Sequence, residues 1–252
     1  MKQWTLKCFV LILLSSLLLT IHMKWSNEAF GKSESTKKSP RVLVIFVDMS
    51  GSANIARRTV YRKAFEKIKQ NLSQGDRVMV GPITGRSYID FKPTVDVEIP
   101  EKTIWVNRIQ FERNLTQAKE KIRREADRLL SRKRGTQRTE ILNSLNIAET
   151  FFHNEKRQKI LVILSDMIQD SKEYNFAQAK VTDKYIDEVI RSQQKHNLIP
   201  NLIDVKIYVA GASGTDSNKF RSIEKFWARY FGKSGADFSH HRYGHSLIEF
   251  EK

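Results

Sequence analysis

Two short runs of apolar, largely β-branched residues constrain the fold of this chain more than any other feature. They are VLVIFV at residues 42–47 and KILVIL at residues 159–164. Neither run alternates apolar with polar residues, so a strand formed by either one must be covered on both faces. Strands of that kind occur in parallel sheets that carry helices on each side. The two runs therefore predict a buried, parallel β-sheet.

The rest of the chain supplies further strands and the helices that would cover them. Strands are expected at residues 77–83 and 202–210, the second nearer an edge because it partly alternates, and at residues 245–250. Apolar residues recur every three or four positions in five segments, and Gly232 is expected to end the last of these helices. The segments lie near residues 60–72, 115–130, 141–152, 185–190 and 220–231. Strands that alternate with helices predict an α/β fold, a doubly wound, mostly parallel sheet with helices on both faces.

The first 25 residues differ in composition from the rest. Residues 8–21 form an uncharged, Leu-rich run of 14 residues that follows Lys2 and Lys7. A membrane span needs about 20 apolar residues, so this run is closer to the core of a signal peptide. Trp4 and Trp25 flank it, which keeps an uncleaved signal-anchor as the alternative. We expect targeting at residues 1–25, a flexible linker at 26–40 and one α/β domain at 41–252, working in the periplasm, at the cell surface or as a secreted protein.

The charge balance limits the kind of partner. The chain has 44 Lys and Arg against 28 Asp and Glu, a formal net charge of +16. Such a surface favours an anionic partner: nucleic acid, an acidic membrane or wall, or an acidic protein. The only cysteine is Cys8, so neither an intramolecular disulfide nor a Cys-based zinc site can form.

Oxygen-bearing side chains follow the two apolar runs. Asp48, Ser50 and Ser52 come after the first, Asp166 comes after the second, and Thr139 opens the third predicted helix. Because ligands bind beyond the carboxyl ends of parallel strands, these side chains are expected at one edge of the sheet. Carboxylate and hydroxyl oxygens suit a hard divalent cation such as Mg²⁺ or Mn²⁺. With only two carboxylates, the cation would keep a position open for an incoming acidic oxygen.

The pattern Asp48-x-Ser50-x-Ser52, followed by Thr139 and then by Asp166 after a strand, resembles the metal-ion-dependent adhesion site of von Willebrand factor A domains. The resemblance covers about residues 41–250 and implies the doubly wound fold. It implies that Ser50, Ser52 and Thr139 touch the metal directly, that the two aspartates act partly through water, and that a ligand carboxylate completes the shell. Where that family often has Gly after the last aspartate, this chain has Met167.

The resemblance implies a non-enzymatic module that recognises an acidic protein partner through a Mg²⁺-bridged carboxylate, and the N-terminal segment implies that this module is exported and tethered to a membrane. A run rich in basic residues leads directly to Thr139: residues 113–138 hold ten Lys and Arg and three Asp and Glu. Such a run is ordinarily a solvated helix face. Our sharper hypothesis is a basic rim beside the metal that attracts acidic ligands, formed by Arg132, Lys133, Arg134 and Arg138.

Two other functions remain open at this point. A metal-dependent phosphoesterase could use the same ligand set; it would need a base or a second metal, for which Asp170 is the nearby candidate. A protein that binds nucleic acid or another anionic surface could use the basic face, although an export signal and the lack of aromatic residues within the basic run argue against nucleic acid. Taken singly, each proposed ligand is also an ordinary helix cap or turn residue.

Overall fold

The computed structural model describes residues 38–50, 55–102, 106–132 and 137–251. The chain divides into two units, Met1–Lys38 and Ser39–Lys252, and the fold below is that of the second. The predicted targeting segment and residues 26–37 of the predicted linker lie outside the described residues. None of the described helices is both long and apolar enough to cross a membrane.

The centre of the fold is β1 (Arg41–Asp48), in which all eight residues are buried. It pairs in parallel with two strands: Ile45 lies opposite Val80 of β2 (Arg77–Ile83) and Val162 of β4 (Gln158–Leu164). The six-stranded sheet has the order β3-β2-β1-β4-β5-β6. It is completed by β3 (Val95–Glu98), β5 (Val205–Ala210) and β6 (Tyr243–Gly244), and only β3 runs antiparallel.

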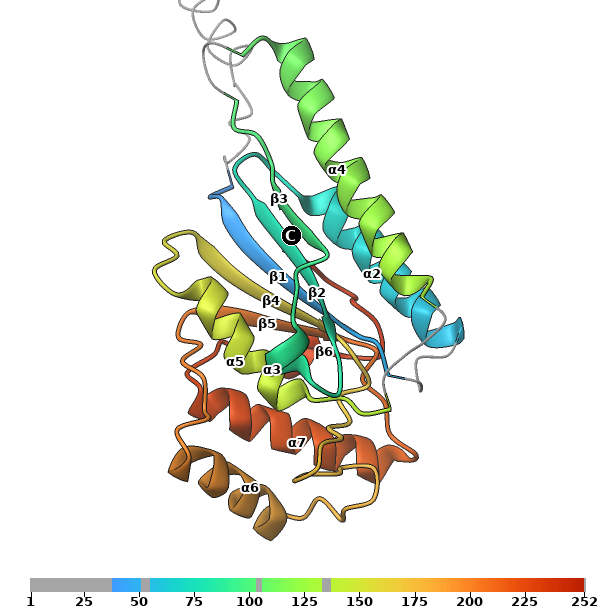
Figure 1. Ribbon diagram of the computed structural model, residues 1–252, viewed down its shortest axis with the longest axis vertical. Coiled ribbons are helices and arrows are strands. Elements are labelled where there is room, and N and C mark those ends of the chain that lie inside the picture. Colours follow the sequence, from blue (N-terminus) through green and yellow to red (C-terminus); the bar gives the residue numbers. More distant parts are fainter. Residues whose placement is uncertain (1–37, 51–54, 103–105, 133–136, 252) are drawn as a thin grey trace, which may run out of the picture. The chain divides into compact units, whose positions relative to one another are not determined.

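Helices cover both faces of this sheet, as the uninterrupted apolar runs predict (Figure 1). Alternate residues of β1 belong to two separate clusters of buried side chains. Leu43 and Ile45 lie in the cluster with α2 (Ile55–Asn71) and α4 (Arg108–Leu130). Val44 and Phe46 lie in the cluster with α5 (Ile141–Phe152), α6 (Asp183–Lys195) and α7 (Ser217–Lys233). A short helix, α3 (Ser87–Asp90), follows β2, and a 3-10 turn (His240–Arg242) precedes β6.

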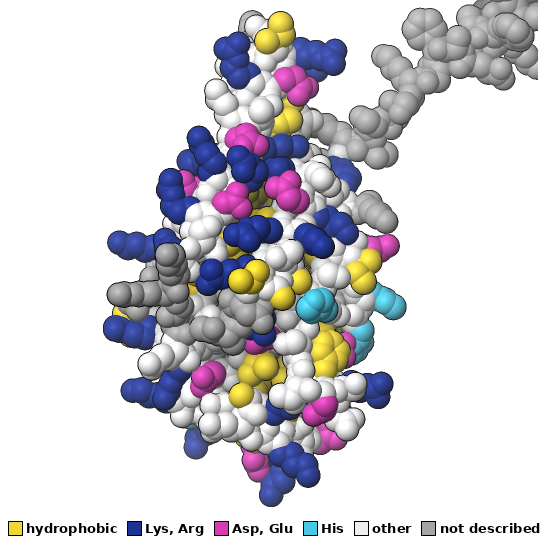
Figure 2. All heavy atoms as spheres, turned by 90° about the vertical axis from the view of Figure 1, so that its right-hand side faces the viewer, with side chains coloured by type: hydrophobic (Ala, Val, Ile, Leu, Met, Phe, Trp, Pro, Cys, Tyr) yellow, Lys and Arg dark blue, Asp and Glu magenta, His cyan; other side chains and the backbone are white. Residues whose placement is uncertain are grey.

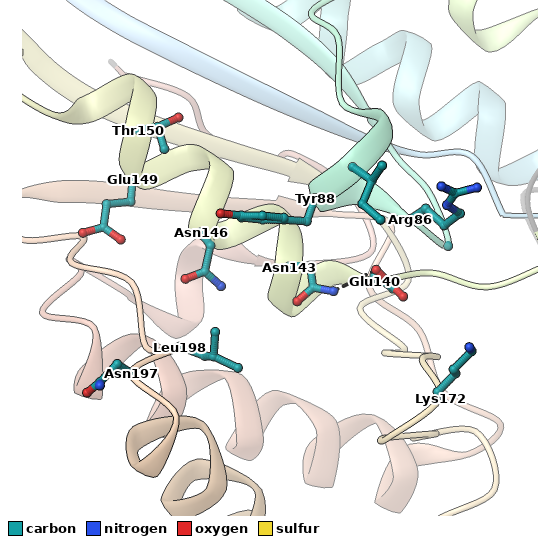
Figure 3. Close-up of a pocket in the computed structure, with 12 residues that line it drawn as sticks. Arg86, Tyr88, Glu140, Asn143, Asn146, Glu149, Thr150, Lys172, Asn197 and Leu198 are labelled. Atoms are coloured by element: carbon teal, nitrogen blue, oxygen red, sulfur yellow. Dashed lines mark hydrogen bonds between the residues drawn. The ribbon is translucent and has the colours of Figure 1, made fainter.

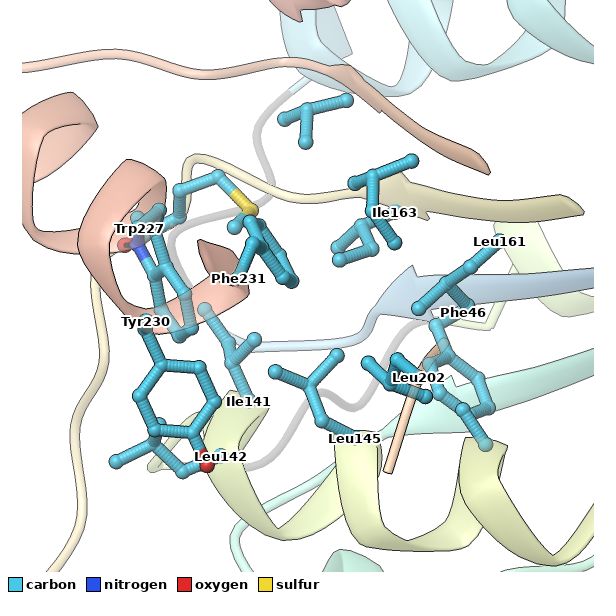
Figure 4. Close-up of a cluster of buried hydrophobic side chains, with 14 of the residues drawn as sticks. Phe46, Ile141, Leu142, Leu145, Leu161, Ile163, Leu202, Trp227, Tyr230 and Phe231 are labelled. Carbon is cyan, nitrogen blue, oxygen red and sulfur yellow. Dashed lines mark hydrogen bonds between the residues drawn. The ribbon is translucent and has the colours of Figure 1, made fainter. Parts of the chain in front are cut away.

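Aromatic packing joins α7 to the segment that follows β4. The rings of Phe176 and Phe226 meet edge to face with their centroids 4.6 Å apart, and Trp227 packs beside both. Figure 4 shows Trp227 and Tyr230 of α7 facing the side chains of α5 across this core. The Trp227 indole donates a hydrogen bond of 2.8 Å to the carbonyl of Met167. The core therefore fixes the backbone directly after Asp166.

Three details differ from the sequence prediction. The short antiparallel β3 was not predicted. Residues 245–250, predicted as a strand, form none: Lys67 donates to the carbonyl of Leu247, and Phe250 is buried against Tyr208 without ladder pairing. Gly232 does not end α7, which continues to Lys233; Gly235, two residues beyond the helix, has the left-handed φ of +76°.

Candidate metal centre

The topology of the sheet places a crevice beyond the end of β1. From β1 the chain proceeds to β2 and β3 on one side, then starts again with β4 on the other side of β1. In open α/β sheets, ligands bind at such a switch point, outside the carboxyl ends of the strands. Asp48 is the last residue of β1, and Asp166 lies two residues beyond β4. Both predicted carboxylates therefore lie at the switch point.

Asp48 is almost fully buried, with 1% of its surface exposed. Its Oδ1 accepts a hydrogen bond of 2.8 Å from the Ser50 amide, and its Oδ2 accepts one of 2.9 Å from the Ser165 hydroxyl. Burial, and after it the negative charge of Asp166, raises the pKa of the Asp48 carboxyl. The second cause shows that the two carboxylates are close enough to repel each other, so a cation between them would lower the energy of the pair.

Asp166 is also buried, and both of its carboxylate oxygens have partners. Oδ1 accepts a hydrogen bond of 2.9 Å from the Ile168 amide, which closes a tight turn after β4. Oδ2 forms an ion pair of 2.8 Å with a guanidinium nitrogen of Arg57, in the first turn of α2. Arg57 was not among the site residues predicted from the sequence.

Two sets of backbone bonds attach Thr139 to the same edge of the sheet. On one side, two backbone amides donate to consecutive carbonyls at the end of β2. The amide of Met49 donates to Ile83 at 3.2 Å, and the amide of Glu140 donates to Thr84 at 3.0 Å. The residues that follow Asp48 and Thr139 therefore share one support. Thr139 itself is 4% exposed.

On its other side, Thr139 is bonded to the segment after β4. It exchanges backbone hydrogen bonds of 3.0 and 2.9 Å with Asp170. The buried Gln169 side chain accepts hydrogen bonds from the amides of Ile141 (2.8 Å) and Leu142 (3.1 Å), and so caps the start of α5. The structure thus brings Asp48, Ser50, Thr139 and Asp166 to one edge of the sheet.

Ser52 lies outside the described residues, as do Lys133 and Arg134 of the predicted rim. Arg132 and Arg138 are exposed. The carbonyl of Arg132 accepts a hydrogen bond from Arg58 of α2 at 3.1 Å, which places the end of α4 beside the start of α2. The role of these residues, and that of the four gathered side chains as metal ligands, stays a prediction.

Much of the basic run before Thr139 is a solvated helix face of mixed charge. On α4, Arg123 pairs with Glu120 and Asp127, and Arg128 pairs with Glu125. Figure 2 shows Lys and Arg interspersed with Asp and Glu over this side of the molecule. Exposed pairs of this kind contribute little to stability. Any basic rim is therefore confined to the end of the run, next to Thr139.

Met167 occupies the position where the resembled family often has glycine, and its backbone is left-handed with φ of +64°. Its side chain is fully buried in the core beneath α7. The chain therefore forms a glycine-type turn with a methionine, and burial of the side chain, together with the Trp227 bond, offsets the strain. The turn that aims Asp166 at the crevice is retained.

Two buried tyrosine hydroxyls, those of Tyr61 and Tyr243, have no hydrogen-bond partner among the described residues. Burial is the main cause that raises the pKa of each phenol, and the charge of Asp166 contributes to both. Polar atoms of this kind are rarely left without a partner in protein interiors.

The donor set fits a hard divalent cation. It consists only of oxygens: two buried carboxylates that repel each other and the hydroxyls of Ser50 and Thr139. Within the described ranges, no three His, Cys, Asp or Glu side chains cluster as a metal site. A cation here would therefore depend on the hydroxyls, as the resemblance implies, and would keep a coordination position for a ligand.

Sequence reasoning missed the residues that support this set from a distance. Ser165 directly precedes Asp166 and could have been marked by that adjacency. Gln169 and Arg57 carry no such signal, because their partners lie more than 25 positions away in the chain. Only the fold reveals them.

The predicted doubly wound fold is confirmed: the sheet has the strand order 3-2-1-4-5-6 and carries helices on both faces. No protein-family model and no curated protein matches the sequence. Similar solved structures include a von Willebrand factor type A protein from Catenulispora acidiphila, at 15% identity over 78% of this chain and 42% of that one, TM-score 0.43.

The descriptions of two other similar solved structures name a bound metal. They are the manganese-loaded TRAP protein of Plasmodium vivax (15% identity, 73% of this chain and 62% of that one, TM-score 0.39) and the mussel byssus proximal thread matrix protein 1 with a zinc-occupied MIDAS motif (13%, 74% and 39%, TM-score 0.39). This chain spans less than two thirds of the length of each of the three.

Proposed function

We propose that this chain is a non-enzymatic binding module that acts outside the cytoplasm and holds an acidic protein partner through a divalent cation. The cation, Mg²⁺ or Mn²⁺, is bound by Asp48, Ser50, Ser52, Thr139 and Asp166. The observation that carries the proposal is the pair of buried carboxylates, Asp48 and Asp166, at the switch point of the sheet. Residues 1–25 direct export and tether the module to a membrane.

The chemistry favours a carboxylate as the group that is recognised. Two protein carboxylates neutralise a divalent cation only in part once Arg57 is counted, so the centre retains positive charge for one more acidic oxygen. Serine and threonine hydroxyls are neutral ligands and do not reduce that charge. A single metal-bridged bond would give direction, while the surrounding contacts supply most of the affinity.

A cavity beside Thr139 offers such contacts. It has a volume of about 720 Å³ and is lined by residues of α3, α5 and the loops beside them. In Figure 3, Tyr88 and the α5 side chains of Asn143 and Asn146 lie on one side and Leu198 on the other. Tyr88 and Ile89 are largely exposed, at 70% and 71%. A protein ligand bound at the metal can extend into this hollow, where a tyrosine ring, aliphatic side chains and amide groups are available.

The proposed basic rim would raise the rate at which an acidic partner meets the site. It is formed by Arg132, Lys133, Arg134 and Arg138. Positive charge around a binding site accelerates the approach of an acidic partner and makes association depend on salt. Reversing the charge of Arg132, Lys133 and Arg134 should slow association and flatten its salt dependence. An unchanged salt slope would rule the rim out.

The test begins with the metal alone. Calorimetric titration of Mn²⁺ into the wild type, Ser50→Ala and Ser234→Ala should show one site that Ser50→Ala weakens and Ser234→Ala leaves intact. Ser234 is the control because it is equally buried but follows α7, where its amide and hydroxyl bond to the helix end and its carbonyl to Leu202. Absence of a Ser50-dependent site would contradict the proposal.

Partner capture with Mg²⁺ or with chelator then tests the function. Partners that depend on both the metal and Ser50 support a binding module. Hydrolysis of a generic phosphoester that vanishes in Asp48→Ala would instead favour the enzyme. Nucleic-acid binding that persists in chelator would favour the basic face.

A further inference from the structure

Arg57 lies beside the proposed metal ligands as a cation belonging to the protein itself. Its guanidinium nitrogen is 2.8 Å from Oδ2 of Asp166, and the two side chains are only 16% and 6% exposed. The other carboxylate oxygen, Oδ1, already accepts the Ile168 amide. Oδ2 is therefore the oxygen that a metal ion, or a water bound to it, would have to share with Arg57.

The position of Arg57 is unfavourable for the helix that carries it. The first turn of α2, described from Ile55 onward, holds no acidic side chain, and a cation there opposes the positive end of the helix dipole. The ion pair with Asp166 offsets this cost. The neighbouring Arg58 points elsewhere, to the carbonyl of Arg132. The two consecutive arginines thus reach different groups, Arg57 the carboxylate of Asp166 and Arg58 the carbonyl of Arg132.

The formal charges show what Arg57 does to the centre. Asp48, Asp166 and Arg57 together carry one negative charge, so a divalent cation leaves the centre with one positive charge and a ligand carboxylate then neutralises it. Without Arg57, the two aspartates alone neutralise the cation and a ligand carboxylate adds an uncompensated negative charge. Arg57 therefore opposes the cation and favours the carboxylate.

We propose that Arg57 sets the balance between these two binding events: it lowers the affinity of the centre for the divalent cation and raises the affinity of the cation-loaded centre for a carboxylate ligand. In the absence of the cation it holds Asp166 in place. The centre then takes up the metal and its acidic partner together more readily than the metal alone. This inference rests on the proposed function.

Titration of Mn²⁺ alone tests the first half. Arg57→Gln should bind Mn²⁺ about tenfold more tightly than the wild type. Arg58→Gln removes the same charge from the adjacent position and should change the affinity by less than about twofold. Arg57→Lys keeps the charge and should stay near the wild type. Circular dichroism confirms that each variant is folded, and if Arg57→Gln fails to fold, Arg57→Met takes its place.

Acetate, as the carboxylate probe, tests the second half. Because a ligand of the loaded centre increases the apparent affinity for the metal, acetate should tighten Mn²⁺ binding in the wild type more than in Arg57→Gln. A residue that merely stabilised the fold would not shift the two measurements in opposite directions. Equal Mn²⁺ affinity in the wild type and Arg57→Gln would overturn this inference and leave the metal site standing. No Mn²⁺ binding by either would overturn the proposed function itself.

Discussion

The left-handed backbone of Met167 gives the sharpest test of how the chain forms the turn after Asp166. The side chain is 0% exposed, so truncation to alanine should cost about 2–5 kcal/mol of the free energy of unfolding. Alanine keeps the Cβ that the φ of +64° disfavours, at about 1–2 kcal/mol. Glycine loses the Cβ as well, and this relieves that strain.

Met167→Gly should therefore be more stable than Met167→Ala by about 1 kcal/mol, once the greater backbone entropy of unfolded glycine, about 0.5–1 kcal/mol, is subtracted from the relief. Both variants should be less stable than the wild type. Met79 is the matched control because it is 2% exposed in the regular strand β2, where the alanine variant should be the more stable of the pair.

Urea unfolding in chelator, followed by tryptophan fluorescence, measures these differences. The Trp227 indole reports on this turn directly, since it donates to the Met167 carbonyl. If Met167→Ala were as stable as Met167→Gly, or more so, the turn would not impose the strain argued here.

Three further predictions concern the supports of the fold. Asp76→Asn should cost about 3–5 kcal/mol of unfolding free energy in chemical denaturation, because it leaves the buried Arg41 guanidinium without its carboxylate. The affinity for Mn²⁺ should not change, since the pair lies at the opposite end of β1. A changed affinity would contradict this separation of the pair from the metal site. Gln169→Ala should cost about 1–3 kcal/mol and weaken Mn²⁺ binding, because two amides at the start of α5 lose their acceptor; a stability equal to the wild type would show that water replaces the cap. Hydrogen bonding from Arg157 lowers the pKa of Glu155 to about 2, so this carboxylate stabilises the fold above pH 4.5 and the contribution is lost as the pH falls towards 2. In an acid titration, Glu155→Gln should therefore lose less stability over that interval than the wild type. An identical pH profile for the two proteins would refute the assignment.

The main architecture could be read from the sequence because its signals are local. The run at residues 42–47 is β1, the run at 159–164 falls within β4, and the five helical patterns became α2, α4, α5, α6 and α7. The signals failed where an element is too short to have a period, as in β3 with its four residues. They also failed at residues 245–250, where Leu247 and Phe250 are buried by packing and not by strand pairing, while Ile248 is exposed.

The residues that gather at this edge of the sheet could be predicted from the sequence, but the residues that support them could not. Asp48, Thr139 and Asp166 each follow a strand or open a helix, and that placement is visible in the sequence. The ion pair of Arg57 with Asp166 joins residues far apart in the chain, and nothing in the sequence near Arg57 indicates it. The left-handed φ of Met167 was equally hidden, because methionine rarely adopts it.

Anomalous X-ray scattering from crystals soaked in Mn²⁺ tests the central claim most directly, since it locates the ion without reference to any assay. We expect a peak at the switch point between β1 and β4, within bonding distance of the Ser50 and Thr139 hydroxyls and between Asp48 and Asp166. A crystal without such a peak at saturating Mn²⁺, or with its ordered manganese elsewhere, would contradict the account.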